Sequence, residues 1–594
     1  MAHIPRHLIV SSNQLTWKFD RPVIFLGQWC CLYQDREIWG CMDGMLAKPY
    51  GLDQNEKEKN HAESRRLEEA ILPVLIKVLN GHHKVSYDSR CWQIILGHWL
   101  RQFIELMLNR VKTLQQCFKT YPINGVTLSI MPNFQLAPKN SLDSIFLSNK
   151  DEWNNHLTKR ILDLMDGINC PIELIYINKT LQKKENPATW KNLGKKIIKD
   201  WFRSLVNSVA TYLSENNSYF VFNTYLPKYL ELKLQLHLKQ VPIIPMSVEF
   251  GTATVSSKAL REELTFEFLK CFNHDCEVTR IIGSMIFELL PICYLEAFSE
   301  LIKLVDQQPW PKSPRLIFTS NSFHTDEIFK IYTARNVQMG TSYLVGQHGN
   351  NYGTSRYLNP SIQEVTADKY LTWGWTDGLA QHTPAFNLRA PKIKYKTKSG
   401  NQGLLLIMKA PEHRITTWDC SAEYGEYLVQ QFKFIECLPD RVKMSLTIRL
   451  HAAHSLQEWD EGKRFHHLNP KIQIDYGNLP IERLISKSKL VVHAYDSTGL
   501  LQTLAGNVPS IGFWQGGVNH LRESAVPYYQ LLAESGVLQF TPESAANLIS
   551  ECWDDVNGWW HQERIQFARK KFCERYSLQV EKPLNILVKI LNEN

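Results

Sequence analysis

The chain has 594 residues, too many for a single hydrophobic core, so its length predicts two large domains. Hydrophobic residues make up 44% of the chain and charged residues 21%, which excludes an intrinsically disordered protein on composition. The net charge of +8 is modest, does not call for nucleic acid, and fits an anionic ligand or contact with an anionic membrane surface.

The N-terminal residues lack the long apolar core of a signal peptide, which predicts a cytoplasmic protein. The most apolar long run, Ile281–Phe298, is broken by charges and a proline, so we expect a buried helix rather than a membrane span. Thirteen cysteines without an export signal predict reduced thiols. The pairs Cys271/Cys276 and His451/His454 each lack further ligands at suitable spacing, so no metal site is expected.

The first half of the chain alternates short β-rich runs with helical patterns, which predicts parallel βαβ units. The predicted strands are His7–Ser11, Val23–Gly27, Val126–Met131, Ile172–Ile177 and Tyr219–Tyr225. The predicted helices are Ala62–Leu79, Arg90–Phe118, Trp201–Leu213 and Tyr229–Leu238. The polar stretch Lys183–Lys199 contains six lysines and is interpreted as a solvated loop, with contact to acidic lipid or an anionic acceptor as the alternative.

A domain boundary is predicted at Gln307–Pro314, where three prolines in eight residues disfavour a helix. It separates an N-terminal α/β domain, residues 1–310, from a C-terminal Rossmann-like domain, residues 311–594. In the second domain the predicted strands are Arg315–Thr319, Ser342–Gly346, Tyr370–Thr372, Gly403–Met408, Val442–Leu450 and Leu490–His493. Thr325–Arg335 is a predicted helix, and Ala545–Tyr576 is a predicted helical tail.

The stretch Leu490–Trp514 reads as a buried strand, a polar turn at its carboxyl end, and a helix opened by Ser497 and Thr498. The free N–H groups and positive dipole at such a helix start suit a phosphate group. A plain N-cap on a structural helix is the alternative. His493, beside the turn, favours ligand binding.

The loop Val345–Arg356 (VGQHGNNYGTSR) follows another predicted strand. Its glycines, including Gly349, allow close backbone approach, and Gln347 supplies a polar side chain. His348 can orient a phosphate or act as an acid or base. The loop matches neither a Walker loop nor the dinucleotide GxGxxG motif, which argues against ATP P-loop and nicotinamide chemistry.

Further candidates lie at strand ends or in connections. Ser320–His324 follows a predicted strand, while Arg449 and His451 close another. Arg449 can neutralise a phosphate or a sugar carboxylate. Glu364 lies in the connection after the glycine loop and is, with His348, a candidate base. The chain has no GxSxG elbow and no catalytic-cysteine context, so hydrolysis through a serine or cysteine nucleophile is unsupported.

Residues 315–576 resemble the C-terminal part of a family of transferases found in bacterial O-antigen and capsule gene clusters. The matching segments are Phe318–Asn321, Gln347–Gly349 with Tyr352–Gly353, Leu371–Trp375, Val492–Thr498, Asn507–Pro509, Thr541–Ala546, and Trp553–Val556 with Trp559–Trp560. A looser match continues into the first half through Phe25–Cys30 and Arg90–Gly97.

The resemblance implies a GT-B-like α/β fold, in which two Rossmann-like domains with extra helices face each other across a cleft. It implies a glycosyltransferase of surface carbohydrates, and because the sequence shows no metal-ligand spacing we expect the enzyme to be metal-independent and to have no cofactor. The first domain would bind a glycan or lipid-linked glycan, and the second a nucleotide sugar, for which a cytidine nucleotide is our guess. Carried over by position, His348, His493, Ser497 and Thr498 would line the donor site. Gln502 stands where the family pattern leads us to expect a glutamate that binds the donor.

Three functions stay open from the sequence. The first is a glycosyltransferase that acts on a surface-polysaccharide or lipopolysaccharide acceptor, in the cytoplasm or at the cytoplasmic face of the inner membrane. The second keeps the fold but transfers a polyol phosphate or epimerises a nucleotide sugar. The third is a non-catalytic scaffold or polysaccharide-binding protein, an option that the neutral Gln502 keeps open.

Overall fold

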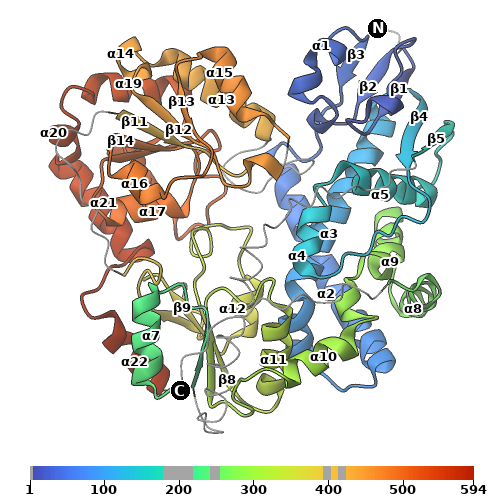
Figure 1. Cartoon of the computed structure of the whole chain (residues 1–594), viewed down its shortest axis with the longest axis horizontal. Helices are drawn as coiled ribbons and strands as arrows, with labels where there is room; N and C mark the ends of the chain where they lie inside the picture. The colour runs from blue at the N-terminus through green and yellow to red at the C-terminus, as the bar shows by residue number, and fades with distance from the viewer. Residues whose placement is uncertain are drawn as a thin grey trace, which may run out of the picture.

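The computed structural model describes residues 4–177, 219–240, 255–391, 403–411, 423–456 and 458–593. In these residues three parallel β-sheets form three lobes. Figure 1 shows the first-sheet lobe in blue and cyan at upper right, the third-sheet lobe in orange at upper left, and the middle-sheet lobe below them. The α/β class with parallel sheets, predicted from alternating strands and helices, is confirmed.

The first sheet has the order β3-β2-β1-β4-β5. Its strands are β1 (Arg6–Ile9), β2 (Val23–Phe25), β3 (Gly44–Leu46), β4 (Ile123–Ile130) and β5 (Ile172–Tyr176). The chain builds outward from β1 on one side and then returns to place β4 on the other side. The carboxyl ends of β1 and β4 therefore form a topological switch point, where open α/β sheets bind ligands.

The third sheet has the order β13-β12-β11-β14-β15-β16. Its strands are β11 (Gly403–Ile407), β12 (Leu446–Arg449), β13 (Gln473–Asp475), β14 (Ser488–His493), β15 (Ser510–Phe513) and β16 (Leu538–Gln539). Numbered along the chain, this is the 3-2-1-4-5-6 order of a Rossmann fold. Its switch point lies between β11 and β14. The first and third sheets thus supply the two Rossmann-like units.

The middle sheet has the order β10-β9-β8-β7-β6. Its strands are β6 (Tyr219–Val221), β7 (Leu316–Thr319), β8 (Ser342–Gly346), β9 (Lys369–Thr372) and β10 (His382–Pro384). Because β6 pairs with β7, this sheet crosses the boundary predicted at Gln307–Pro314. The strands predicted between residues 315 and 372 therefore belong to this sheet and not to the Rossmann-like sheet of residues 403–539. The assignment of acceptor and donor roles to two domains stays a prediction.

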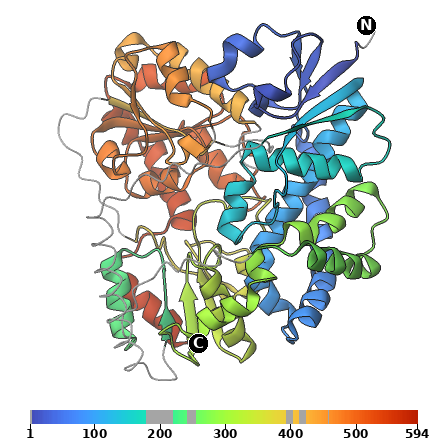
Figure 2. The same cartoon turned by 45° about the vertical axis from the view of Figure 1, so that its right-hand side comes forward.

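Two long helices connect the first-sheet lobe to the middle-sheet lobe, as Figures 1 and 2 show. These are α2 (Gln54–His83) and α3 (Ser89–Thr120), which begin at the side-chain caps Asp53 and Asp88. Helix α3 packs against α11 (Glu327–Gln338) and α12 (Ile362–Thr366) beside the middle sheet. Its Trp92 and Trp99 are almost fully buried, so α3 belongs to the core that joins the two lobes.

The other face of the middle sheet is covered by α7 (Lys228–His237) and α22 (Pro583–Asn592), which lie side by side in Figure 1. They share a separate hydrophobic core with strands of the middle sheet. The remaining α-helices of the described residues are α1 (Arg36–Trp39), α4 (Ser141–Leu147), α5 (Asp151–Leu164), α8 (Lys258–Cys271), α9 (Glu277–Leu289), α10 (Phe298–Asp306), α13 (Tyr424–Cys437), α14 (Asp440–Lys443), α15 (Glu461–Leu468), α16 (Ile481–Ile485), α17 (Thr498–Ala505), α18 (Val526–Glu534), α19 (Pro542–Cys552), α20 (Val556–Trp560) and α21 (Glu563–Tyr576).

Most predicted elements are present, with shifted ends. The predicted strand Val442–Leu450 is wrong in its first part, because α14 ends inside it and β12 starts only at Leu446. Ile281–Phe298 contains most of the buried helix α9, as predicted. The basic stretch Lys183–Lys199 and the predicted helix Trp201–Leu213 lie outside the described residues. Within the described part of the chain, no helix is both long and apolar enough to span a membrane.

Candidate functional site

The predicted phosphate-binding turn lies at the switch point of the third sheet. Strand β14 pairs with β11 on one side and β15 on the other, and its carboxyl end leads through a short turn into α17. Ser497 is the N-cap of α17, and its Oγ accepts a hydrogen bond from Leu500 N over 3.0 Å. The predicted strand–turn–helix is thus present, at the edge where ligands of such sheets bind.

His493 supports this turn from the buried side. Its ring is fully buried, with Nε2 3.0 Å from Thr503 Oγ1 and Nδ1 3.2 Å from Ser497 Oγ. Because the Thr503 hydroxyl donates to Leu500 O, Nε2–H donates to Thr503 and Nδ1 accepts from Ser497. Burial lowers the pKa of His493 to about 3, so the ring is neutral. His493 therefore orients the N-cap and does not face a ligand.

Thr498 joins α17 to the predicted glycine loop. Its Oγ1 accepts a hydrogen bond from Asn350 N over 3.0 Å, and a Cβ at Gly349 would lie 3.0 Å from the same oxygen. Gly349 thus permits the close approach expected of it. Among the described residues, nothing accepts a hydrogen bond from the backbone N–H of Thr498 or Gly499. These two groups are the unpaired donors that a helix start offers to an anion.

A buried carboxylate in the same turn was missed by the sequence reasoning. Asp496 Oδ1 accepts from Asn350 Nδ2 over 2.7 Å, and Oδ2 lies 3.0 Å from His520 Nε2. The Tyr529 hydroxyl lies 3.0 Å from both oxygens, and burial raises the pKa of Tyr529 well above its usual value. An Asp three residues after the end of β14 was the available signal. Asp496 fixes the turn to the glycine loop.

His348 lies at the carboxyl end of β8, half-buried between side chains of three loops. Its Nδ1 lies 3.0 Å from the Ser320 carbonyl, and its Nε2 lies 3.0 Å from the Tyr225 hydroxyl. A carbonyl only accepts, so Nδ1 carries the proton and Nε2 is the basic nitrogen. Burial is the main cause that lowers the pKa of His348 below its ordinary value. A neutral imidazole with a basic Nε2 at a strand end has the chemistry of a general base.

Two more histidines lie beside His348. The centre of the His98 ring, from α3, lies 5.1 Å from that of His324 and 5.4 Å from that of Phe323. The Phe323 ring centre in turn lies 5.8 Å from that of His348. Burial lowers the pKa of His324 to about 4, and it also lowers the pKa of His98 well below its ordinary value. The three rings are therefore neutral together near pH 7.

The same neighbourhood contains unusual backbone conformations and unpaired polar atoms. Asn223, Tyr225 and Asn351 have φ values of 54°, 61° and 74°, in the left-handed region that costs energy for residues other than glycine. Among the described residues, Ser320 Oγ, His98 Nε2 and Asn351 Oδ1 are buried without a hydrogen-bond partner. Since buried polar groups are generally paired, these atoms suit a polar ligand. Tyr225 was missed because its partner His348 is far away in sequence.

Glu364 and Gln347 have structural roles instead of the predicted ones. Glu364 is fully buried; its Oε2 accepts from Ser361 in a capping box, and its Oε1 lies 3.0 Å from His382 Nε2. It has no access to an acceptor hydroxyl. Gln347 Oε1 accepts from Trp373 N and Trp375 Nε1, and its Nε2 donates to Gly349 O. Gln347 therefore shapes the glycine loop from inside.

Three other predicted donor residues have no described contact with α17's first turn. Arg449 pairs with Asp475, and also donates to Leu479 O over 2.8 Å, so its charge is already compensated. His451 is exposed at the end of β12, and its Nδ1 accepts from Ala453 N. Gln502 lies one turn into α17, and no side-chain hydrogen bond of Gln502 occurs among the described residues.

The described residues contain no group of three or more His, Cys, Asp or Glu side chains arranged to hold a metal ion. The His98 ring is stacked on that of Phe323, and the His348 ring is tilted by 37° against that of Tyr225. The site is thus built from the loops after β6, β7, β8 and β14. We call this set the junction site: Tyr225, His324, His348, Asn350, Asp496 and Thr498 with their loops.

Comparison with known proteins gives one strong match. A model of the LIC12162 family transferases matches residues 6–591, almost the whole chain. No curated protein matches.

Among solved structures, the wall teichoic acid polymerase TagF shares 11% identity, covering 66% of this chain and 92% of that one, with a TM-score of 0.31. MurG of Acinetobacter baumannii shares 12%, covering 66% and 96%, with a TM-score of 0.30. UDP-GlcNAc 2-epimerase of Neisseria meningitidis, bound to UDP-GlcNAc, shares 11%, covering 64% and 100%, with a TM-score of 0.33. TM-scores this low carry no weight, so the fold rests on the chain's own strand order.

Proposed function

Since the chain belongs to the LIC12162 family of transferases, we propose that it is a glycosyltransferase of the GT-B type. It moves a sugar from a nucleotide-activated donor to a surface-polysaccharide or lipopolysaccharide acceptor. One observation carries the proposal: the first turn of α17 presents the unpaired N–H groups of Thr498 and Gly499 at the switch point of a sheet with Rossmann order.

The donor's phosphates bind at the start of α17. Two backbone N–H groups and the positive end of the helix dipole favour negative charge there. The same groups stabilise the charge that develops on the leaving phosphate as the bond to the sugar breaks. Asp496, held by Asn350, His520 and Tyr529, keeps the turn rigid. Such preorganisation is what an electrostatic catalyst requires. We place a cytidine nucleotide first among the donors.

His348 is the proposed base. The acceptor hydroxyl displaces the Tyr225 hydroxyl from Nε2, gives its proton to Nε2, and attacks the anomeric carbon of the donor. The bond between that carbon and the phosphate oxygen breaks, and the nucleotide leaves with the electron pair. The Ser320 carbonyl holds the proton on Nδ1, so that Nε2 stays the accepting nitrogen. Glu364 has no part in this step, because it is buried under its own cap.

A thermal-shift screen with CMP, CDP, UDP, GDP and their sugar conjugates tests the donor site. A nucleotide at a concentration of 100 times its Kd should stabilise the protein by about 2.7 kcal/mol. In the variant Thr498→Asp the side chain can still accept the hydrogen bond from Asn350 N, and its negative charge interacts favourably with the positive end of the helix dipole. The same carboxylate repels phosphate. Thr498→Asp should therefore lose the nucleotide-induced rise in melting temperature. The matched variant Thr541→Asp, at the N-cap of α19, should retain it.

Product analysis follows with the nucleotide sugar that gives the largest shift. A transferase releases the nucleotide at a rate that depends on added glycan acceptor, whereas an epimerase needs no acceptor. If no nucleotide changes the melting temperature, or if Thr498→Asp responds like the wild type, the donor-site proposal is wrong.

A further inference from the structure

Beside the junction site lies a guanidinium group that no described carboxylate neutralises. Arg389 is exposed, and its guanidinium carbon lies 5.7 Å from the ring centre of Tyr225. Within the described part of the chain, Arg389 makes neither a hydrogen bond nor an ion pair. It therefore presents a free positive charge to the residues that surround His348.

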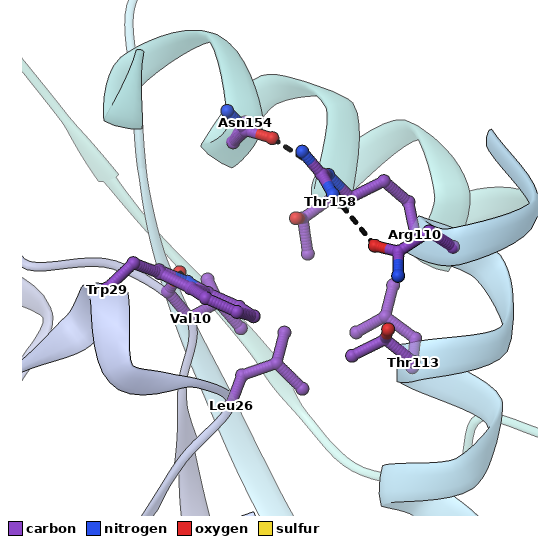
Figure 3. Close-up of a pocket in the computed structure, with 9 residues that line it drawn as sticks. Val10, Leu26, Trp29, Arg110, Thr113, Asn154 and Thr158 are labelled. Atoms are coloured by element: carbon purple, nitrogen blue, oxygen red, sulfur yellow. Dashed lines mark hydrogen bonds between the residues drawn. The ribbon is translucent and has the colours of Figure 1, made fainter. Parts of the chain in front are cut away.

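Other arginines close to the carboxyl edges of the sheets already have partners. Arg110, in the pocket at the first sheet that Figure 3 shows, donates to Asn154 Oδ1 over 3.0 Å and to Asn109 Oδ1 over 2.9 Å. Three more are paired with carboxylates, namely Arg356 with Glu58, Arg449 with Asp475, and Arg522 with Asp377. Arg389 differs from all four, because its guanidinium is available to a ligand.

The backbone next to Arg389 is firmly anchored. Leu388 is fully buried in the separate hydrophobic core that α7 and α22 share with the middle sheet. The neighbouring Asn387 is also fully buried, and its backbone N–H donates to Leu578 O over 2.8 Å. The fold therefore fixes the position of residue 389 beside Tyr225. Such preorganisation lowers the entropy that a ligand must offset on binding.

The charge of Arg389 acts on the proposed base. The Tyr225 hydroxyl lies 3.0 Å from His348 Nε2, and the two ring centres are 4.6 Å apart. The guanidinium thus lies within about 10 Å of the imidazole, a distance over which charges still interact in 0.1 M salt. Burial lowers the pKa of His348, and the positive charge of Arg389 lowers it as well. No described carboxylate opposes this effect.

A carboxylate or a phosphate beside the reacting hydroxyl of a substrate would supply the missing negative charge. A planar guanidinium binds either group through paired, charge-assisted hydrogen bonds. The bound anion would also offset the charge that lowers the pKa of His348, so the base becomes stronger once the substrate is in place. Arg389 can thus serve both recognition and the activation of the base.

The position of Tyr225 indicates which substrate carries the anion. In the proposed reaction the acceptor hydroxyl replaces the Tyr225 hydroxyl at His348 Nε2, and Arg389 lies over that same tyrosine ring. The phosphates of the donor are assigned to the start of α17, at Thr498 and Gly499. An anion at Arg389 therefore belongs to the acceptor.

We propose that Arg389 selects an acidic acceptor, a glycan whose reacting sugar carries a carboxylate or a phosphate. This inference rests on the proposed function for the role of acceptor. The affinity of Arg389 for an anionic sugar, in contrast, does not depend on the binding of a nucleotide.

Arginine labelling tests the site on the full chain without nucleotide. Phenylglyoxal modifies accessible guanidinium groups, and peptide mass spectrometry reports each arginine separately. Methyl glucuronide and methyl glucoside 6-phosphate are the acidic probes, and methyl glucoside is their neutral counterpart. At least one acidic probe should slow the labelling of Arg389 several-fold, whereas methyl glucoside should not. The exposed Arg483 of α16, a helix that precedes β14 and so lies away from the carboxyl edge, should be labelled equally throughout.

The affinities of variants for the same three probes, measured by saturation-transfer NMR, give the second readout. Arg389→Gln should weaken the binding of the preferred acidic probe by about tenfold or more, as expected for a lost hydrogen bond to a charged group. Its affinity for methyl glucoside should not change. Arg389→Lys keeps the charge and should retain part of the preference. Arg483→Gln is the matched control and should behave like the wild type.

All three variants should fold, because both arginines are exposed and Arg389 has no bond to lose in the described part of the chain. The proposal is overturned if neither acidic probe binds, if the acidic and neutral probes protect Arg389 equally, or if Arg389→Gln keeps the affinity for both acidic probes. Protection by CDP or UDP but by no acidic sugar would assign the guanidinium to the donor and contradict an acidic acceptor.

A preference for acidic sugars that disappears in Arg389→Gln, together with no response to any nucleotide, would support the role of Arg389 and contradict the proposed function instead.

Discussion

The backbone N–H of Asn350 donates a hydrogen bond to the side-chain oxygen of Thr498 over 3.0 Å, although the two residues belong to different sheets. Asn350 follows β8 of the middle sheet, and Thr498 opens α17 beside the third sheet. The carboxyl edges of the two sheets therefore meet at this bond. It places the basic nitrogen of His348, two residues before Asn350, in the loop that faces the proposed phosphate-binding turn.

Replacing Thr498 with Val should lower the melting temperature by several degrees. The variant leaves the Asn350 N–H without an acceptor in a nearly buried position, which costs about 1–3 kcal/mol. Thr498→Ser keeps the oxygen and should melt within about a degree of the wild type. Differential scanning calorimetry of both variants checks this, and a stable Thr498→Val would mean that the bond contributes nothing.

Asp496→Asn should be more damaging than a comparable change at the surface. The two carboxylate oxygens of Asp496 accept hydrogen bonds from Asn350, His520 and Tyr529. The single amide oxygen of Asn cannot accept all of them, and the amide NH2 would face another hydrogen-bond donor. We expect a loss of about 3 kcal/mol, from buried hydrogen bonds to a charged group. Asp554→Asn, which alters an exposed partner of Arg441, should cost under about 1 kcal/mol. Urea titrations of both variants give the comparison.

His493 should make the protein sensitive to mild acid. Its pKa is about 3 in the folded chain and near 6.5 when unfolded, so the unfolded chain takes up the proton first. The stabilisation is complete above pH 6.5 and is lost as the pH falls towards 3, at up to about 1.4 kcal/mol per pH unit.

His493→Asn, which does not titrate, should flatten the dependence of unfolding free energy on pH between 6.5 and 5. The exposed His561→Asn is the control and should leave the slope unchanged. An identical slope in His493→Asn and the wild type would show that the buried ring is not the titrating group.

Glu364→Gln separates a structural role from a catalytic one. The variant weakens the capping box with Ser361 and the contact with His382, so the melting temperature should fall by several degrees. The turnover of the folded enzyme below its melting temperature should stay within about twofold. A loss of turnover of 100-fold or more in correctly folded protein, the size typical of a lost general base, would instead return Glu364 to the candidate bases.

His348→Gln should lower turnover by about 100-fold or more, as removal of a general base does, while nucleotide binding is retained. Because burial lowers the pKa of His348, wild-type turnover should stay level through neutral pH and fall only in acid, below the ordinary histidine range. Tyr225→Phe leaves Nε2 without its hydroxyl partner and should change turnover by less than tenfold. Single-turnover rates across pH 5–8 check all three proteins.

The sequence predicted local structure well where one segment contains its own determinants. The strand, polar turn and Ser-Thr helix start of Leu490–Ala505 could be read directly, because the N-cap of Ser497 depends on residues three positions away. The resemblance implied a donor site lined by His348, Ser497 and Thr498, which stays a prediction; the bond between Asn350 and Thr498 places the two segments side by side.

What the sequence could not supply were partners from distant segments. Arg449 looked like a free cation at a strand end, but Asp475 of the neighbouring strand pairs with it. Glu364 looked accessible in a connection, but the fold buries it beneath His382. The middle sheet was missed because β6 pairs across a long stretch of intervening chain, which no local pattern encodes.

The second core of the middle-sheet lobe is assembled from stretches made at different times during synthesis. Leu230 and Leu234 of α7, Phe318 of β7, and Leu587 and Leu591 of α22 pack in that one core. A ribosome releases residues 583–592 long after β6 and α7 have emerged. Until then α7 alone, among the described helices, covers that face of the middle sheet, so the nascent chain exposes the apolar surface that α22 later covers.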